Sequence, residues 1–408
     1  MTYFASGDCA KTIDYSQKFL AIAREIKDPY FEVESLDNMG RAYFCLGDYT
    51  KAIDYSQQSL VIRQKFGDYN GQGRILHTIG AALYKSGNFA AAETTLIDAI
   101  KIWESQRAEL GSNDPYKVSV FELQVATYDN LQKVLIAQNK TEGALEITER
   151  GRGRALVDLL ARRLSTQQTQ NRASLPTVEP PTIERIKQIA SAQKATLVEY
   201  SIMYDWFKVQ GKQQIHESEL YIWVIKPTGE VTFRRSDLKP LWQQQNTSLE
   251  DLVTIARDSI GVYRSIFSAE VVNPVNEQNQ TQRLQQLHQL LIEPIADLLP
   301  TNPDERVIFI PQSSLFLAPF PALQDKDGKY LIEKHTILTS PSIQVLELTR
   351  EQRQRVGARQ IASPQDALVV GNPTMPSFYL TNWNEFINLS VSLDKALSLS
   401  LGISVVTW

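Results

Sequence analysis

Cysteine and histidine are the residues that could carry nucleophilic chemistry in this sequence, and both are scarce. The 408 residues include two cysteines, Cys9 and Cys45, and four histidines. A cysteine nucleophile needs a nearby histidine that holds it as a thiolate and later protonates the leaving group. No cysteine follows Cys45 and no histidine follows His335. The second half of the chain therefore offers no cysteine–histidine pair, and we predict no catalytic residue.

The four histidines do not indicate a metal site either. His77 falls in a repeated segment, His216 in a predicted polar loop, His288 on a predicted helix and His335 in a predicted strand. Metal sites built from histidine use short, regular spacings, which this scatter lacks. We expect each histidine to be structural or solvated, and we expect no metal and no other cofactor.

Two other nucleophile candidates are weaker. Ser313 and Ser314 follow a predicted strand, but the Gly-x-Ser-x-Gly elbow that exposes a serine nucleophile does not surround them. Cys45 stands between Phe44 and Leu46 at a helix position, so it is predicted to be a packing residue.

Composition and charge set the class of protein. Hydrophobic residues make up 43% and charged residues 22%, and the formal net charge is only −4, which argues against a protein built around nucleic-acid or acidic-membrane binding. Two cysteines cannot form a disulfide framework or a zinc ribbon, which favours a reducing compartment. No apolar run reaches the ~18 residues of a membrane helix, and the first residues lack a secretory signal. We therefore predict a cytoplasmic location.

An internal repeat organises the first third of the chain. The segment 7–20 recurs at 47–60, an offset of 40 residues, and a third copy follows at 87–100. Upstream of each glycine, apolar residues are spaced by three and four, as on one stripe of a helix. A looser fourth copy runs over 128–160. Three copies at a fixed offset predict a stack of helix pairs.

Small residues stand where such helix pairs need them. Gly47 and Gly87 occupy the boundary between two predicted helices, where a left-handed C-cap favours glycine. Ala52 and Ala92 occupy positions where two helices must cross closely. These patterns resemble the tetratricopeptide repeat, in which an apolar-x-x-apolar-Gly-x-x-aromatic helix is followed by Gly-Asp-Tyr and a second, aromatic-rich helix.

The resemblance implies a concave face lined by the first helix of each pair, which would bind a protein or peptide ligand. The alternative is that each of these positions is an ordinary solvated one. The residues expected on this face are Asp37, Arg41, Phe44, Arg74, His77, Tyr84 and Lys85.

Glycines among basic residues follow the repeats, in Glu149-Arg150-Gly151-Arg152-Gly153-Arg154. Neither a preceding strand nor a following Gly-Lys-Ser/Thr supports a phosphate loop. We expect instead a solvated helix with basic residues towards its C-terminal end, over 155–163. The stretch from Leu164 is rich in Gln, Ser, Thr and Pro and predicts a flexible linker.

Strands and helices alternate in the second half, which indicates an α/β sheet covered on its faces. The predicted strands are 195–202, a hairpin of 220–225 and 231–234, then 306–311, 331–338 and 367–373. The predicted helices are 249–267, 281–299 and 343–355.

Several of these segments resemble the CHAT domain, a caspase-like cysteine peptidase family found in bacteria, often cyanobacteria, downstream of tetratricopeptide arrays. They include Ile308-Phe309-Ile310-Pro311, Pro319-Phe320-Pro321-Ala322-Leu323 and Val369-Val370-Gly371-Asn372-Pro373. The resemblance implies an α-helical solenoid followed by an α/β caspase-like domain. It also places the family's catalytic histidine and cysteine beyond the Gly-Asn-Pro strand, where this sequence has neither.

The predicted organisation is a repeat array over 1–163, a linker over 164–182 and a partial CHAT domain over 183–408. The repeat copies cover about 7–20, 33–66, 73–106 and 121–163, and the tail 377–408 diverges from the family. Alignment of the copies starts the chain midway through a first helix, and the tail suggests truncation before the His–Cys dyad.

Two functions stay open at this point. The first is a non-catalytic scaffold that binds a protein or peptide through the repeats, without nucleic acid or membrane. The second is a fragment of a CHAT cysteine endopeptidase whose dyad lies in missing downstream sequence. A sheet without its later strands would expose an apolar edge, so self-association is also expected.

Overall fold

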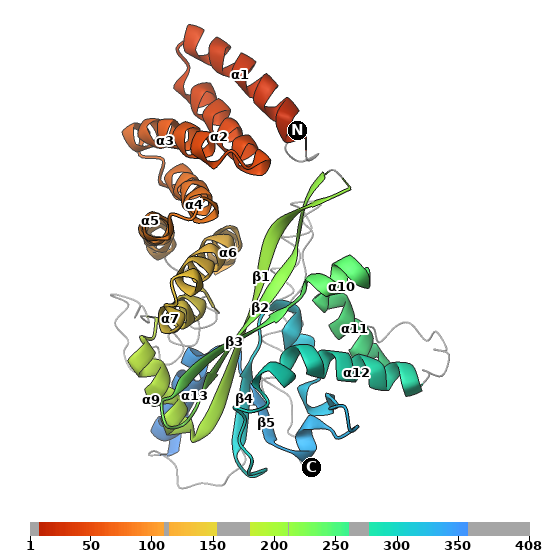
Figure 1. Cartoon of the computed structure of the whole chain (residues 1–408). Coiled ribbons are helices and arrows are strands. Elements are labelled where there is room, and N and C mark those ends of the chain that lie inside the picture. The colour runs from red at the N-terminus through yellow and green to blue at the C-terminus, as the bar shows by residue number, and fades with distance from the viewer. Residues whose placement is uncertain (1–7, 110–113, 153–179, 211, 261–276, 358–408) are drawn as a thin grey trace.

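A computed structural model describes residues 8–109, 114–152, 180–210, 212–260 and 277–357. Helices α1 to α7 form a curved stack, and a mixed α/β part with a five-stranded sheet follows (Figure 1). This architecture confirms the predicted fold class of a helical repeat array followed by an α/β part. The predicted linker, the basic helix over 155–163 and the tail lie outside the described residues.

The repeat helices follow one another with short connections. They are α1 (Cys9–Glu25), α2 (Pro29–Leu46), α3 (Tyr49–Phe66), α4 (Tyr69–Lys85), α5 (Phe89–Glu109), α6 (Asp114–Ala137) and α7 (Thr141–Gly151). Helices α2 and α4 begin 40 residues apart, as do α3 and α5, which matches the offset of the sequence repeat. Aspartates at N-cap positions, such as Asp28 and Asp48, accept hydrogen bonds from first-turn amides and start successive helices.

The small residues of the repeat have the predicted roles. Gly47 and Gly87 adopt φ of +80° and +82°, a left-handed conformation that side chains disfavour. Ala52 and Ala92 are fully buried between helices. A Cβ added to Gly80 would approach the side chain of Leu96 to 2.6 Å, so this helix crossing requires glycine.

The cysteines correct one prediction. Cys9 and Cys45 form a disulfide bond between the start of α1 and the end of α2, with their Cα atoms 6.3 Å apart. The expectation that Cys45 is a packing thiol was wrong because the two residues lie in different repeat copies and meet only when α1 packs against α2. The disulfide also removes the reason for expecting a reducing compartment, because both cysteines of the chain are paired.

The sheet has the strand order β3-β2-β1-β4-β5. Strand β1 (Ala195–Val209) pairs antiparallel with β2 (Lys212–Ile225), which pairs antiparallel with β3 (Val231–Asp237). On its other side β1 pairs parallel with β4 (Arg306–Ile310), which pairs parallel with β5 (Thr336–Thr339).

Helices cover both faces of this sheet (Figure 1). They are α9 (Ile183–Gln193), α10 (Lys239–Gln244), α11 (Leu249–Ser259), α12 (Glu277–Leu291) and α13 (Ile343–Gly357), with short 3₁₀ turns at Glu293–Ile295, Ser313–Leu317, Phe320–Ala322 and Leu331–Glu333.

Alternate residues of the strands enter two separate cores. Val198 and Tyr200 pack on the face covered by α10, α11 and α12. Leu197 and Trp223 point to the opposite face, where they share one apolar cluster with α9 and with repeat helices α5 to α7. The repeats and the sheet are thus joined by a common core as well as by the chain.

Several predicted strands differ in the structure. The strands predicted over 195–202 and 220–225 are longer, as β1 and β2, and pair with each other as a hairpin that was not predicted, so His216 lies on β2 and not in a loop. The strand predicted over 331–338 becomes a 3₁₀ turn followed by β5, and His335 precedes that strand. The strand predicted over 367–373 lies outside the described residues.

Candidate functional site

The concave side of the repeats forms a groove with a volume of about 650 Å³. Its first wall consists of α2, α4 and α6, which are the first helices of successive pairs, and residues spaced by three or four on each helix point into it. All seven residues predicted from the repeat pattern line this one cavity: Asp37, Arg41, Phe44, Arg74, His77, Tyr84 and Lys85.

The second wall of the groove is the extended hairpin of β1 and β2, which sequence reasoning missed. Tyr204, Asp205, Trp206 and Ile215 complete the lining. Trp206 pairs directly with Ile215 across the two strands, and the hairpin projects from the sheet along the repeats (Figure 1). The aromatic and β-branched residues Tyr204, Trp206, Phe207 and Ile215 favour strands and could have indicated that this segment is part of a hairpin.

Ion pairs and hydrogen bonds fix the hairpin against the repeats. The Asp205 carboxylate lies 2.9 Å from Lys85 Nζ on α4 and 3.1 Å from Lys133 Nζ on α6. Lys133 also donates to the carbonyl of Tyr204. Ser218 Oγ donates to the same carboxylate at 2.9 Å, so Asp205 is positioned from both sides. Lys133 is 5% exposed, and its burial lowers its pKa.

At the α2 end of the groove, the carboxylate of Asp37 lies close to several arginines. Its buried carboxylate accepts hydrogen bonds from Ser59 and Arg63, and Arg74 Nη2 lies 3.8 Å away. Burial raises the pKa of Asp37 although these cations oppose the shift. Burial, together with the neighbouring charge of Arg74, lowers the pKa of Arg41.

At the α6 end, Asp129 presents a carboxylate to the groove. Among the described residues, none donates a hydrogen bond to it, and burial raises its pKa to about 7. On α4, His77 Nδ1 lies 3.1 Å from Thr127 Oγ1, and burial lowers its pKa to about 4. His77 is therefore neutral at physiological pH and serves as a hydrogen-bonding group.

The groove can bind through shape, apolar contact and hydrogen bonds. Its lining contains four carboxylates and four lysine or arginine side chains, so its formal charges balance. Aromatic residues supply most of its large apolar surfaces, a composition typical of recognition sites. They are Phe44, Tyr84, Trp103, Tyr204 and Trp206.

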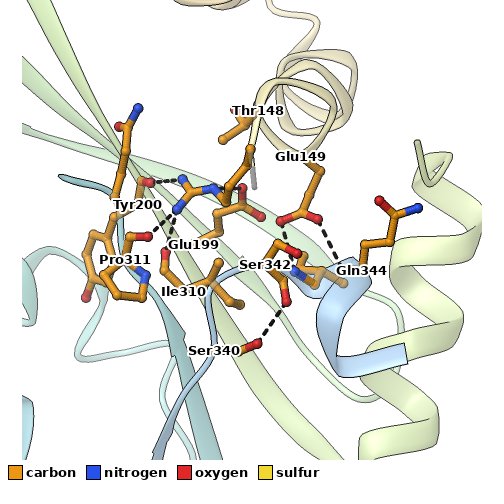
Figure 2. Close-up of polar contacts among 12 residues, drawn as sticks. Thr148, Glu149, Glu199, Tyr200, Ile310, Pro311, Ser340, Ser342 and Gln344 are labelled. Carbon is orange, nitrogen blue, oxygen red and sulfur yellow. Dashed lines mark hydrogen bonds and ion pairs between the residues drawn. The ribbon is translucent and has the colours of Figure 1, made fainter. Parts of the chain in front are cut away.

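A second polar cluster lies buried at the junction between the repeats and the sheet (Figure 2). Arg152, directly after α7, donates to the carbonyl of Tyr200 within β1 and to those of Ile310 and Pro311 at the end of β4. Its Nε lies 3.3 Å from the Glu199 carboxylate, which is fully buried. A solvated basic stretch therefore does not begin at Arg152, whose guanidinium is buried against these carbonyls.

Glu149 links the same junction to α13. Its carboxylate accepts hydrogen bonds from the amides of Ile343 at 2.9 Å and Gln344 at 3.2 Å, at the start of that helix (Figure 2). Burial raises the pKa of Glu149, and burial together with the charge of Glu149 raises that of Glu199 well above its usual value. One arginine thus faces two carboxyl groups, and the burial of both favours their neutral form.

The other histidines that were considered as nucleophile partners or metal ligands do not come together. His216 stacks on Trp242 with ring centroids 4.4 Å apart, and His288 lies on α12. Within the described ranges, no group of three or more His, Cys, Asp and Glu side chains could hold a metal ion.

Comparison with known families agrees with this geometry. The tetratricopeptide repeat model matches residues 1–65 and 31–105, and the CHAT domain model matches residues 281–396. The chain carries tetratricopeptide repeats and a CHAT domain. The groove lies on the helices of the repeats, and β4, β5 and α13 fall within the CHAT match.

Two curated relatives are much longer proteins. Human tetratricopeptide repeat protein 28 is 25% identical over 375 residues, which cover 73% of this chain and 15% of that protein. The mouse protein of the same name is 24% identical over 376 residues, with the same shares. The chain thus spans about 15% of the length of these relatives. Among the helices described, none is both long and apolar enough to cross a bilayer.

Proposed function

We propose that the chain is an interaction scaffold whose groove binds an extended segment of a partner protein. The observation that carries this proposal is the composite lining, in which α2, α4 and α6 face the hairpin of β1 and β2 across one cavity. Tetratricopeptide repeats in general mediate protein–protein interactions, which supports the same function.

The lining also indicates the chemistry of the partner. Because the charges of the groove balance and its large surfaces are aromatic, the bound segment presents apolar or aromatic side chains and little net charge. The amide groups of Asn38 and Asn130 also line the groove and offer both donors and acceptors to a peptide backbone. Binding should depend only weakly on salt concentration, since few counterions are displaced.

A peptide-display library selected on the full chain tests this proposal. Thr78 lines the groove on α4, and its hydroxyl bonds only the carbonyl of Arg74 in its own helix at 3.1 Å among the bonds described. Thr78→Trp should fill the cavity and weaken selected peptides by at least about tenfold.

Thr94 provides the matched control. It makes the same bond within its own helix, to Ala90 at 3.2 Å on α5, and does not line the groove. Thr94→Trp should leave peptide affinity unchanged. Peptides that lose affinity equally with both variants, or with neither, would contradict the proposal.

We further propose that the CHAT domain of this chain is non-catalytic. The chain has no cysteine after Cys45 and no histidine after His335. The alternative, a CHAT cysteine endopeptidase whose His–Cys dyad is supplied by further sequence, stays a prediction. A peptide-based electrophile that targets active-site cysteines should not label the chain, and stoichiometric labelling at one cysteine would refute the proposal.

A further inference from the structure

The two cysteines of the chain are joined beside the groove. Cys9 is the first residue of α1 and Cys45 is the penultimate residue of α2, and no further cysteine occurs in the sequence. The disulfide closes a loop with a sequence separation of 36 residues that contains both helices. Such a crosslink restricts the unfolded chain and favours the packed pair of helices.

Noncovalent packing holds α1 less firmly than it holds the later helices. The buried cluster around α1 and α2 consists of Leu20, Leu36 and Met39, with three partly buried neighbours. By contrast, α5 to α7 share a large core with the sheet. Apolar side chains on α1 also stay exposed, among them Ile22 at 52% and Ile26 at 57%. The crosslink therefore adds a covalent attachment to a helix that buries few apolar side chains.

The crosslinked helix also forms the outer wall of the groove. Phe44, which lines the groove, directly precedes Cys45 in α2. The carbonyl of Cys45 accepts a hydrogen bond at 3.1 Å from Gln213 Nε2, on the hairpin that forms the opposite wall. Displacement of Cys45 would therefore disturb both the helical wall, through Phe44, and the hairpin wall, through Gln213.

We propose that Cys9 and Cys45 form a thiol–disulfide exchange site that holds the α2 wall of the groove in place when oxidised and loosens it when reduced. Cys45 is only half-buried, whereas Cys9 is 4% exposed, so exchange begins at Cys45. This regulation goes beyond ligand binding itself.

The chemistry requires a small-molecule thiol or its disulfide as the second reactant. A thiolate attacks the sulfur of Cys45, a mixed disulfide forms, and the Cys9 sulfur leaves as a thiolate that takes up a proton. A second thiolate then attacks the mixed disulfide, which releases the small-molecule disulfide and the Cys45 thiolate. Two thiols are oxidised while the protein disulfide is reduced, and the reverse sequence restores the crosslink.

Hydrogen–deuterium exchange of the full chain, incubated with oxidised or reduced dithiothreitol, tests the proposal without any groove ligand. After reduction, amides of α1 and α2 should exchange at least about tenfold faster, while those of β1 and β4 should not change. Alkylation should count no free thiol in the oxidised sample and two in the reduced one.

A double variant, Cys9→Ser with Cys45→Ser, is the matched control. It should exchange at the reduced rate with either reagent, because no other cysteine can respond. Two alkylated thiols after incubation with oxidised dithiothreitol, or equal exchange rates in the oxidised and reduced wild-type chain, would overturn the proposal. Because the readout needs no ligand, failure here is distinct from failure of the proposed binding function.

Discussion

The groove and the junction are both polar clusters between the repeats and the sheet, but they treat their charges differently. In the groove, Arg74 is 54% exposed and lies 3.8 Å from its partner carboxylate. At the junction, Arg152 is 7% exposed and donates to three backbone carbonyls. Exposed charges contribute little to stability and remain available for a ligand, whereas a buried charge that satisfies backbone groups supports the fold.

The difference assigns binding to the groove and structural support to the junction. Two carboxylates show the same distinction. That of Asp129 in the groove has no hydrogen-bond donor among the described residues, while that of Glu149 at the junction accepts hydrogen bonds from two amides. Asp129 thus keeps hydrogen-bonding capacity for a ligand, whereas Arg152 and Glu149 use theirs on backbone groups.

The largest expected effect comes from applying one substitution to both regions. Arg152→Met should lower the free energy of unfolding by about 3–5 kcal/mol, because three buried carbonyls lose their charged donor. Arg74→Met should change it by less than about 0.5 kcal/mol, since Arg74 is exposed and Asp37 keeps its hydrogen bonds from Ser59 and Arg63. Urea denaturation of both variants checks this contrast. Equal losses would remove the distinction between the two regions.

A smaller effect is expected at Asp129, whose pKa is raised to about 7 by burial. Its folded-state pKa exceeds the unfolded value, so its favourable contribution is present at low pH and is lost as the pH rises from about 4 to about 7. Asp129→Asn should remove that decline and raise the unfolding free energy near pH 8 by about 2 kcal/mol. Thermal denaturation across this pH range provides the measurement. Wild-type and variant curves that stay parallel would disprove the assignment.

The smallest effect is expected at Glu199, which lies beside Arg152 in the junction. Because burial raises its pKa, a neutral isostere resembles the protonated form that the fold prefers. Glu199→Gln should therefore change stability near neutral pH by less than about 1 kcal/mol, far less than Arg152→Met. Denaturation of the two variants under the same conditions compares them. A loss as large as that of Arg152→Met would mean that the junction depends on the ion pair and not on the backbone contacts.

Local periodicity explains which parts of the molecule could be predicted from the sequence. The repeat at an offset of 40 residues placed the concave helices, and with them all seven predicted groove residues. The hairpin wall was missed because the polar residues around Gln214 and His216 resemble a loop, although they pair with β1. Arg152 and the Cys9–Cys45 bond were missed because their partners lie far away in the sequence or in another repeat. Contacts between distant elements carry no local pattern.

A hydrogen-exchange footprint of a library-selected peptide on the full chain tests the central claim most directly. If the groove is a composite site, the peptide should protect amides in α2, α4 and α6 and also in the hairpin segment 204–217. Protection on both walls is the predicted result. Protection that spares the hairpin, or that lies outside the groove, would contradict the account.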